Sequence, residues 1–108
     1  MREFKEERVY ITMEIPVRNK EIIEQIIRNK NISFNECINR AIKNNFKSSL
    51  TKINIYKREE GEPTKLRIYK SVYLPISNFA KKYDISITKI INHCIYEEVK
   101  KYSKVKVN

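Results

Sequence analysis

The sequence has little of what most enzymes and secreted proteins need. It contains one glycine, one histidine and two cysteines among 108 residues. A single glycine rules out a glycine-rich phosphate loop, and a single histidine leaves no Ser/His/Asp set that can be assembled. Two cysteines, Cys37 and Cys94, do not make a disulfide scaffold or a metal cluster. We therefore expect no enzyme, no cofactor, no metal site and no small-molecule substrate.

Long apolar runs are also missing. No stretch of 18 or more apolar residues occurs, which excludes a membrane-spanning helix. Residues 1–7 are charged and lack the apolar centre of a secretory signal. We expect an intracellular, cytoplasmic protein that forms one compact unit at most.

Positive charge is abundant. Lysine and arginine number 23 against 13 aspartate and glutamate residues, giving a formal net charge of +10. Such a charge attracts polyanions through long-range electrostatics and counterion release. Membrane surfaces and acidic proteins would be attracted as well, so charge alone favours nucleic acid as the partner without fixing it.

An internal repeat organises the chain. When Ser33 is set over Ser86, apolar positions recur in both copies at i, i+3, i+4, i+7, i+8 and i+12, which is one face of an amphipathic helix. Each serine is a candidate N-cap. Asn31 and Asp84 stand where the preceding helix must stop, and both residue types tolerate the left-handed conformation that ends helices. Each copy therefore predicts two helices joined by a tight turn.

A strand is predicted before each helix pair. Residues 9–15 alternate between apolar and polar side chains, and residues 68–74 alternate less cleanly. Pro16 and Pro75 follow these segments, and proline both ends a strand and suits the first turn of a helix. This alignment predicts first helices over 17–30 and 76–83, with the second shorter by six residues.

The predicted organisation has three parts. Residues 1–47 form the first motif, 48–66 a linker, and 67–108 the second motif with a basic C-terminal tail. Within the linker, residues 53–56 alternate and predict an extra strand, which would form a hairpin with the second ribbon. Residues 59–63 carry a turn signal. The C-terminal lysines fit either a loosely ordered tail or a solvated helix face.

Strand, proline, helix, Asn/Asp-apolar-Ser turn and helix, in this order, resemble the ribbon-helix-helix repressors of the Arc, MetJ and CopG kind. Two copies in one chain also resemble the tandem regulators of archaeal filamentous viruses of the AvtR type. The first copy keeps the family's spacing between strand and second helix, and the second copy does not. The resemblance implies an α+β fold in which two motifs form a pseudo-dimer, within the chain or swapped between chains, with an antiparallel β-ribbon. It further implies a sequence-specific transcriptional regulator, repressor or activator, that is associated with double-stranded DNA, in the viral case inside an infected archaeal host.

The resemblance also implies which residues contact DNA. The ribbon would read base edges in the major groove with its outward side chains, which are Tyr10, Thr12, Glu14, Tyr69, Ser71 and Tyr73. Phosphates would be contacted before the ribbons and at the N-termini of the second helices, by Arg8, Ser33, Asn35, Lys65, Arg67, Ser86 and Thr88. Glu14 departs from the family, because phosphates repel a carboxylate unless it accepts from a cytosine amino group.

Two other functions remain open. Residues 77–95 have spacings compatible with a helix-turn-helix, which would place Thr88, Lys89 and Asn92 in the major groove. An antitoxin-like protein-interaction module using the basic tail is the second alternative. For the DNA-binding reading, we expect unlike copies to prefer a non-palindromic site, and association along DNA or a homodimer to strengthen binding. His93 aligns with Arg40 and is expected on the surface, whereas both cysteines are expected in the core.

Overall fold

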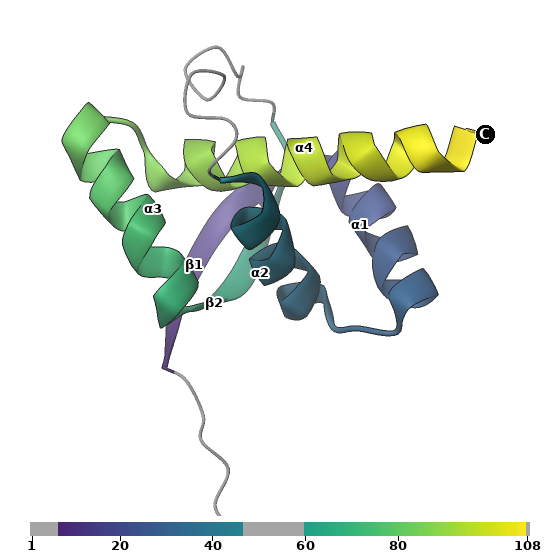
Figure 1. The fold of residues 1–108 in the computed structure, drawn as a ribbon, viewed down its shortest axis with the longest axis horizontal. Helices are drawn as coiled ribbons and strands as arrows, with labels where there is room; N and C mark the ends of the chain where they lie inside the picture. Colours follow the sequence, from purple (N-terminus) through teal and green to yellow (C-terminus); the bar gives the residue numbers. More distant parts are fainter. Residues whose placement is uncertain (1–6, 47–59, 108) are drawn as a thin grey trace, which may run out of the picture.

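The computed structural model describes residues 7–46 and 60–107. Within these residues the fold is α+β, with one two-stranded antiparallel sheet and four helices, which confirms the predicted class. α2 and α4 pack against each other and against the sheet, and α1 and α3 lie on either side (Figure 1). The elements are β1 (Arg8–Ile15), α1 (Val17–Lys30), α2 (Phe34–Asn45), β2 (Glu62–Tyr69), α3 (Lys70–Tyr83) and α4 (Ile87–Val107).

The helix starts and the turn between the helices recur 53 residues later in the second half, and β2 begins 54 residues after β1. α1 and α3 each contain 14 residues and begin at Val17 and Lys70. Asn31 and Asp84 end them in the left-handed conformation, both with φ of 55°, as the sequence predicts. The order strand, helix, helix therefore occurs twice, with the helix starts and caps at a constant offset of 53.

The predicted position of the second strand is wrong. β2 ends at Tyr69, and residues 70–74, assigned to a strand from the sequence, form the start of α3. Pro75 lies inside α3 and ends no strand, so the predicted shortening of this helix by six residues is also wrong. In β2, Thr64, Leu66 and Ile68 alternate inward as Ile11, Met13 and Ile15 do in β1.

The error has a physical cause. The alignment of Pro75 with Pro16 rests on the tendency of proline to end a strand. At the sixth position of α3, Pro75 has no N–H to donate to the carbonyl one turn earlier, and its ring crowds that carbonyl, which together cost about 3 kcal/mol. The tertiary packing of Val72, Ile76 and Ala80, all buried on one helical face, outweighs that loss.

The end of the predicted linker belongs to the sheet. Residues 62–66 lie in β2, so Glu62 and Pro63, which the sequence places in a turn, belong to the strand. Gly61 precedes the strand, and a Cβ atom there would lie 2.0 Å from the carbonyl oxygen of Ile15. Only glycine fits this close approach of the two backbones. The extra strand predicted at 53–56 falls outside the described residues.

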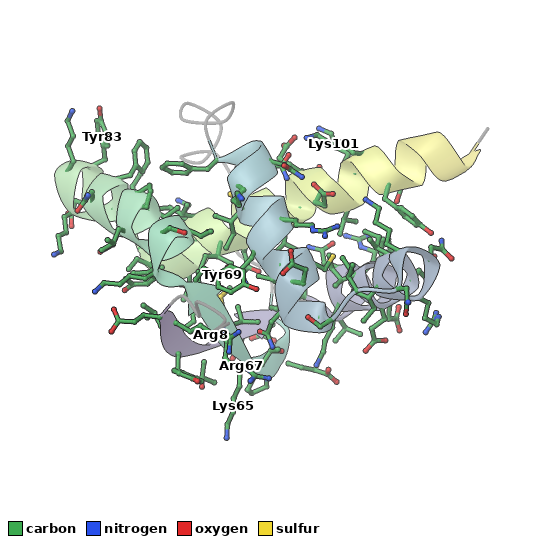
Figure 2. The ribbon with its side chains drawn as sticks, turned by 60° about the horizontal axis from the view of Figure 1, so that its bottom comes forward. Arg8, Lys65, Arg67, Tyr69, Tyr83 and Lys101 are labelled. Atoms are coloured by element: carbon green, nitrogen blue, oxygen red, sulfur yellow. The ribbon has the colours of Figure 1, made fainter. Side chains whose placement is uncertain are left out.

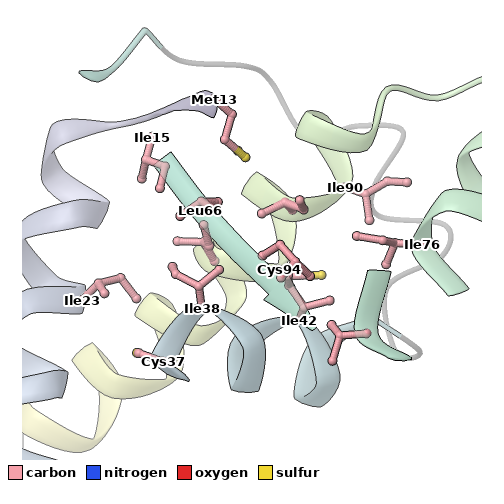
Figure 3. Close-up of a cluster of buried hydrophobic side chains, with 14 of the residues drawn as sticks. Met13, Ile15, Ile23, Cys37, Ile38, Ile42, Leu66, Ile76, Ile90 and Cys94 are labelled. Atoms are coloured by element: carbon pink, nitrogen blue, oxygen red, sulfur yellow. The ribbon is translucent and has the colours of Figure 1, made fainter. Parts of the chain in front are cut away.

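The buried face of the sheet forms the core together with α2 and α4. Figure 3 shows Met13, Ile15 and Leu66 from the strands facing Ile38 and Ile42 from α2. Cys37 and Cys94 are buried, as predicted. Burial raises the pKa of Cys37 to about 11 and that of Cys94 to about 12, so both remain neutral thiols and pack as small apolar groups.

The C-terminal lysines belong to a helix and not to a loose tail. α4 runs to Val107, and its final turns extend over α1 (Figure 1). The Lys101 ammonium donates to Asn45 Oδ1 at 2.6 Å, and Asn29 donates to the Tyr102 hydroxyl. No helix in the described ranges is long and apolar enough to cross a membrane.

Candidate nucleic-acid interface

The outward face of the β1–β2 ribbon is polar and open. Tyr10 is 71% exposed, and Thr12, Lys65 and Arg67 are exposed beside it. Figure 2 shows Arg8, Lys65 and Arg67 on one side of the molecule, with Tyr83 and Lys101 on the opposite side. We call this surface the ribbon face. Its residues are Arg8, Tyr10, Thr12, Glu14, Pro63, Lys65, Arg67 and Tyr69.

Equivalent positions of the two repeats meet at the middle of the ribbon face. Thr12 pairs with Lys65 in the antiparallel ladder, and these two residues are separated by the repeat offset of 53. On one side of this pair Tyr10 faces Arg67, and on the other Glu14 faces Pro63. The two ends of the ribbon face are therefore built from equivalent positions that carry different side chains.

The ribbon face contains some of the predicted base contacts and lacks others. Tyr10, Thr12 and Glu14 lie together on β1, as predicted. Ser71 and Tyr73 lie on α3 and are not on the ribbon face, because the second strand ends before them. Their assignment as base contacts is thus corrected.

Two other residues of β2 occupy the outward positions instead, and the sequence predicts a different role for both. Lys65 and Arg67, predicted to contact phosphates, are the outward residues at the centre of β2. At the constant offset of 53 they are equivalent to Thr12 and Glu14. Sequence reasoning missed Pro63 on this face, and the same offset would have found it.

Tyr69 and Arg8 close one end of the ribbon face. The Tyr69 hydroxyl donates to a Glu36 carboxylate oxygen at 3.1 Å. The Arg8 guanidinium lies 5.6 Å from the centre of the Tyr69 ring, a cation–π distance. Because Tyr69 is half-buried and contacts both Arg8 and Glu36, its main role is to position these two side chains and not to contact a base directly.

Asparagine side chains of α2 hold β2 in place. Arg67 N–H donates to Asn35 Oδ1 at 2.8 Å, and Tyr69 N–H donates to Asn39 Oδ1 at 2.9 Å. The Asn39 amide donates in turn to the Arg67 carbonyl at 3.0 Å. These bonds occupy backbone groups that an edge strand would otherwise expose. They also fix the backbone from which the Arg67 side chain projects.

We call the asparagine that joins a helix to the strand of the other repeat, here Asn39, a clamp. The equivalent asparagine, Asn92, makes only part of these hydrogen bonds. Asn92 on α4 donates to the Glu14 carbonyl at 2.9 Å, as Asn39 does to Arg67. Its Oδ1, however, is buried and has no hydrogen-bond partner among the described residues. The missing donor would be the N–H of residue 16, equivalent to Tyr69, and Pro16 has none.

Replacing Pro16 by alanine is expected to raise the free energy of unfolding by about 1 kcal/mol. The new N–H can donate to Asn92 Oδ1, and satisfying a buried acceptor is worth about 1–3 kcal/mol. Loss of the proline constraint on the unfolded chain costs about 0.4–1 kcal/mol. Urea titration of Pro16→Ala checks this, with Pro16→Ala/Asn92→Ala as the control in which the gain should disappear. A destabilised single variant would contradict the account of Asn92.

The N-termini of α2 and α4 flank the ribbon face. The Ser33 hydroxyl accepts from Glu36 N–H at 3.0 Å, and that of Ser86 accepts from Lys89 N–H at 3.1 Å, which confirms the predicted caps. Shallow hollows lie between each helix start and the ribbon. One is lined by Arg8, Ser33, Asn35, Glu36, Asn39, Arg67 and Tyr69, and another by Thr12, Met13, Glu14, Pro63, Thr88 and Asn92.

The two helix starts differ in charge. Glu36 stands in the first turn of α2, where it accepts from Arg40 Nε at 3.0 Å. The equivalent residue in α4 is Lys89, and no acidic residue occupies that first turn. The favourable potential for an anion is therefore reduced at α2 and reinforced at α4.

Two side chains of α4 that the sequence predicts at the surface, those of Asn92 and His93, are buried. Asn92, a reader in the helix-turn-helix alternative, is only 3% exposed and bonded to Glu14, so its side chain does not face a groove. His93 is also 3% exposed, which overturns its predicted surface position. The histidine packs on the inward side of α4, with its Nε2 at 4.0 Å from a Glu97 carboxylate oxygen.

The residues that hold a metal ion in proteins do not gather here. Among the described residues there is no group of three or more histidine, cysteine, aspartate or glutamate side chains that could bind one. The ribbon face carries cations, hydroxyls, the Glu14 carboxylate and a proline ring. No protein-family model, no curated protein and no solved structure matches this chain.

Proposed function

We propose that this chain is a sequence-specific transcriptional regulator that binds double-stranded DNA with its ribbon face. We further propose that it is a tandem ribbon-helix-helix protein whose two motifs form a pseudo-dimer within one chain. The observation that carries the proposal is the ribbon itself. One face is buried on α2 and α4, and the other presents Tyr10, Thr12, Lys65 and Arg67 to solvent.

The dimensions and chemistry of this face suit the major groove of B-DNA. That groove is about 12 Å wide and admits a two-stranded β-ribbon. Arginine and lysine donate to the O6 and N7 atoms of guanine, and a threonine methyl contacts the thymine methyl. Arg67, Lys65 and Thr12 thus supply both polar and apolar base contacts at the centre of the ribbon.

Phosphates would be held on both sides of the ribbon. Arg8 extends from its end, and the capped starts of α2 and α4 direct free N–H groups beside Ser33, Asn35, Ser86 and Thr88. A bound protein of this kind acts by occupying a site near a promoter, and no catalysis is proposed. The single chain already contains both ribbon strands, so no second chain is needed to complete the reading surface.

Equilibrium binding of the full chain to duplex DNA across salt concentration tests the proposal. We expect the logarithm of the binding constant to fall linearly with the logarithm of salt concentration. The slope should be about −3, because each phosphate neutralised by a cation contributes about −0.9, and the ribbon face offers the three cations Arg8, Lys65 and Arg67. A chain that binds a protein partner tightly but duplex DNA weakly and without this slope would support the protein-interaction alternative instead.

A further inference from the structure

We infer that the two halves of the ribbon face differ in charge, so that the ribbon reads DNA in one orientation. Base recognition is concentrated in the half that carries Arg67. The inference rests on the proposed function and adds to it which residue sets specificity and what kind of site is read. It departs from the two-fold symmetry that two equivalent motifs would otherwise give.

The two halves of the ribbon face have opposite charge. Arg67 and Glu14 are equivalent positions, one basic and one acidic, on either side of the central Thr12–Lys65 pair. Tyr10, which faces Arg67, is equivalent to Pro63, which faces Glu14. One half therefore offers a cation and a phenol, and the other a carboxylate and a proline ring with no hydrogen-bond donor.

The ends of the ribbon continue this difference. Beyond Arg67 stands Arg8, held over the Tyr69 ring. At the other end the position equivalent to Arg8 is Gly61, which has no side chain, and the neighbouring Glu62 pairs with Ile15 and accepts from Lys20 Nζ at 3.2 Å. The charge of Lys20 is thus offset by its partner, whereas that of Arg8 adds to Arg67. The strands themselves therefore attract DNA phosphates at the end that carries Arg8 and Arg67 and not at the end that carries Glu14, where only the start of α4 beside the ribbon favours an anion.

Arg67 is also held in a fixed position by hydrogen bonds to its backbone. Its backbone N–H and carbonyl are bound by Asn35 and Asn39, so the position of its Cα relative to α2 is fixed. Within residues 7–46 and 60–107 no carboxylate forms an ion pair with Arg67 or Lys65. An arginine held in this way can make the bidentate contact to guanine O6 and N7 that gives the strongest base discrimination.

The site that this ribbon selects should therefore be lopsided. One half-site contains a conserved G·C pair contacted by Arg67, and the centre contacts Thr12 and Lys65. The other half-site tolerates many sequences, because proline donates no hydrogen bond to bases and a carboxylate is repelled by the neighbouring phosphates.

Selection of preferred duplexes from a random pool by the full chain tests this. We expect one conserved half-site and one degenerate half-site. Arg67→Ala should lower the preference for the conserved G·C pair by about tenfold or more, whereas Glu14→Ala should change base preference by less than about twofold. Glu14→Arg places arginine at both equivalent positions and should shift the selected site toward an inverted repeat of the G·C half.

The outcomes separate this inference from the proposed function. An inverted repeat selected by the unaltered chain, with both halves equally conserved, would overturn the inference and leave DNA binding in place. So would a Glu14→Ala variant that relaxes one half as strongly as Arg67→Ala does. If the unaltered chain selects no duplex at all, the proposed function fails and the inference falls with it.

Discussion

Replacing Arg67 by alanine is expected to weaken binding to the preferred duplex by roughly 5- to 150-fold. The side chain is exposed, its backbone is fixed by two asparagines, and it lies on the ribbon face next to the central Thr12–Lys65 pair. Losing one base-contacting arginine costs about 1–3 kcal/mol of binding free energy. Fluorescence anisotropy with a labelled duplex at constant salt measures the change.

A matched variant separates local contact from net charge. Lys82→Ala removes the same unit of charge from α3, next to Tyr83, on the side of the molecule opposite Arg67 (Figure 2). We expect this variant to bind the duplex within about twofold of the unaltered chain, because distant surface charges are screened at physiological salt. Equal losses for Arg67→Ala and Lys82→Ala would mean that binding depends on overall charge and not on the ribbon face.

Replacing Asn39 by alanine is expected to lower the free energy of unfolding by about 3 kcal/mol. The side chain is 2% exposed and makes hydrogen bonds with the Tyr69 N–H, the Arg67 carbonyl and the Asn35 carbonyl. Its removal leaves buried backbone groups of β2 without partners, and each such group costs about 1–3 kcal/mol. Urea titration followed by circular dichroism measures the loss.

The second repeat provides the control for this prediction. Asn92 occupies the equivalent position, but it makes one hydrogen bond to the Glu14 carbonyl, and its Oδ1 has no partner among the described residues. Asn92→Ala should therefore cost only about 1 kcal/mol. A larger loss for Asn92→Ala than for Asn39→Ala would contradict the assignment of Asn39 as the main clamp of the sheet.

The first repeat could be predicted from sequence almost completely, because its local signals agree. Alternation before Pro16, the isoleucine stripe over 17–30, and the Asn31 and Ser33 turn each point to the element that the structure shows. In such a segment strand period, helix period and cap residues support one answer. The predicted outward residues of β1 are confirmed for the same reason.

The second repeat shows where local signals conflict. Pro75 and the residues before it match a strand ended by proline, although they lie in α3. The decisive information was global, namely that the helix caps fix an offset of 53, which places Tyr69 and not Pro75 opposite Pro16. With that offset, Lys65 and Arg67 become ribbon-face residues instead of flanking phosphate contacts.

The sequence does not predict the hydrogen bonds of the two clamp asparagines to the strands. Asn39 and Asn92 are the same residue type at equivalent positions, each directly after an isoleucine of a helix, and this coincidence was the available signal. Their role depends on tertiary contacts with the strand of the other repeat, more than twenty residues away in the chain. No local pattern encodes such a contact, because the partner is a backbone group of any residue type.

Photo-crosslinking tests most directly whether the ribbon face lies against DNA. A benzophenone amino acid at position 10 should crosslink to a bound duplex, because the Tyr10 side chain that it replaces is 71% exposed on the ribbon face. The same group at position 83 should not crosslink, because the Tyr83 side chain that it replaces lies on the opposite side of the molecule, where it is 52% exposed. A complex that crosslinks through position 83 and not through position 10 would contradict the account.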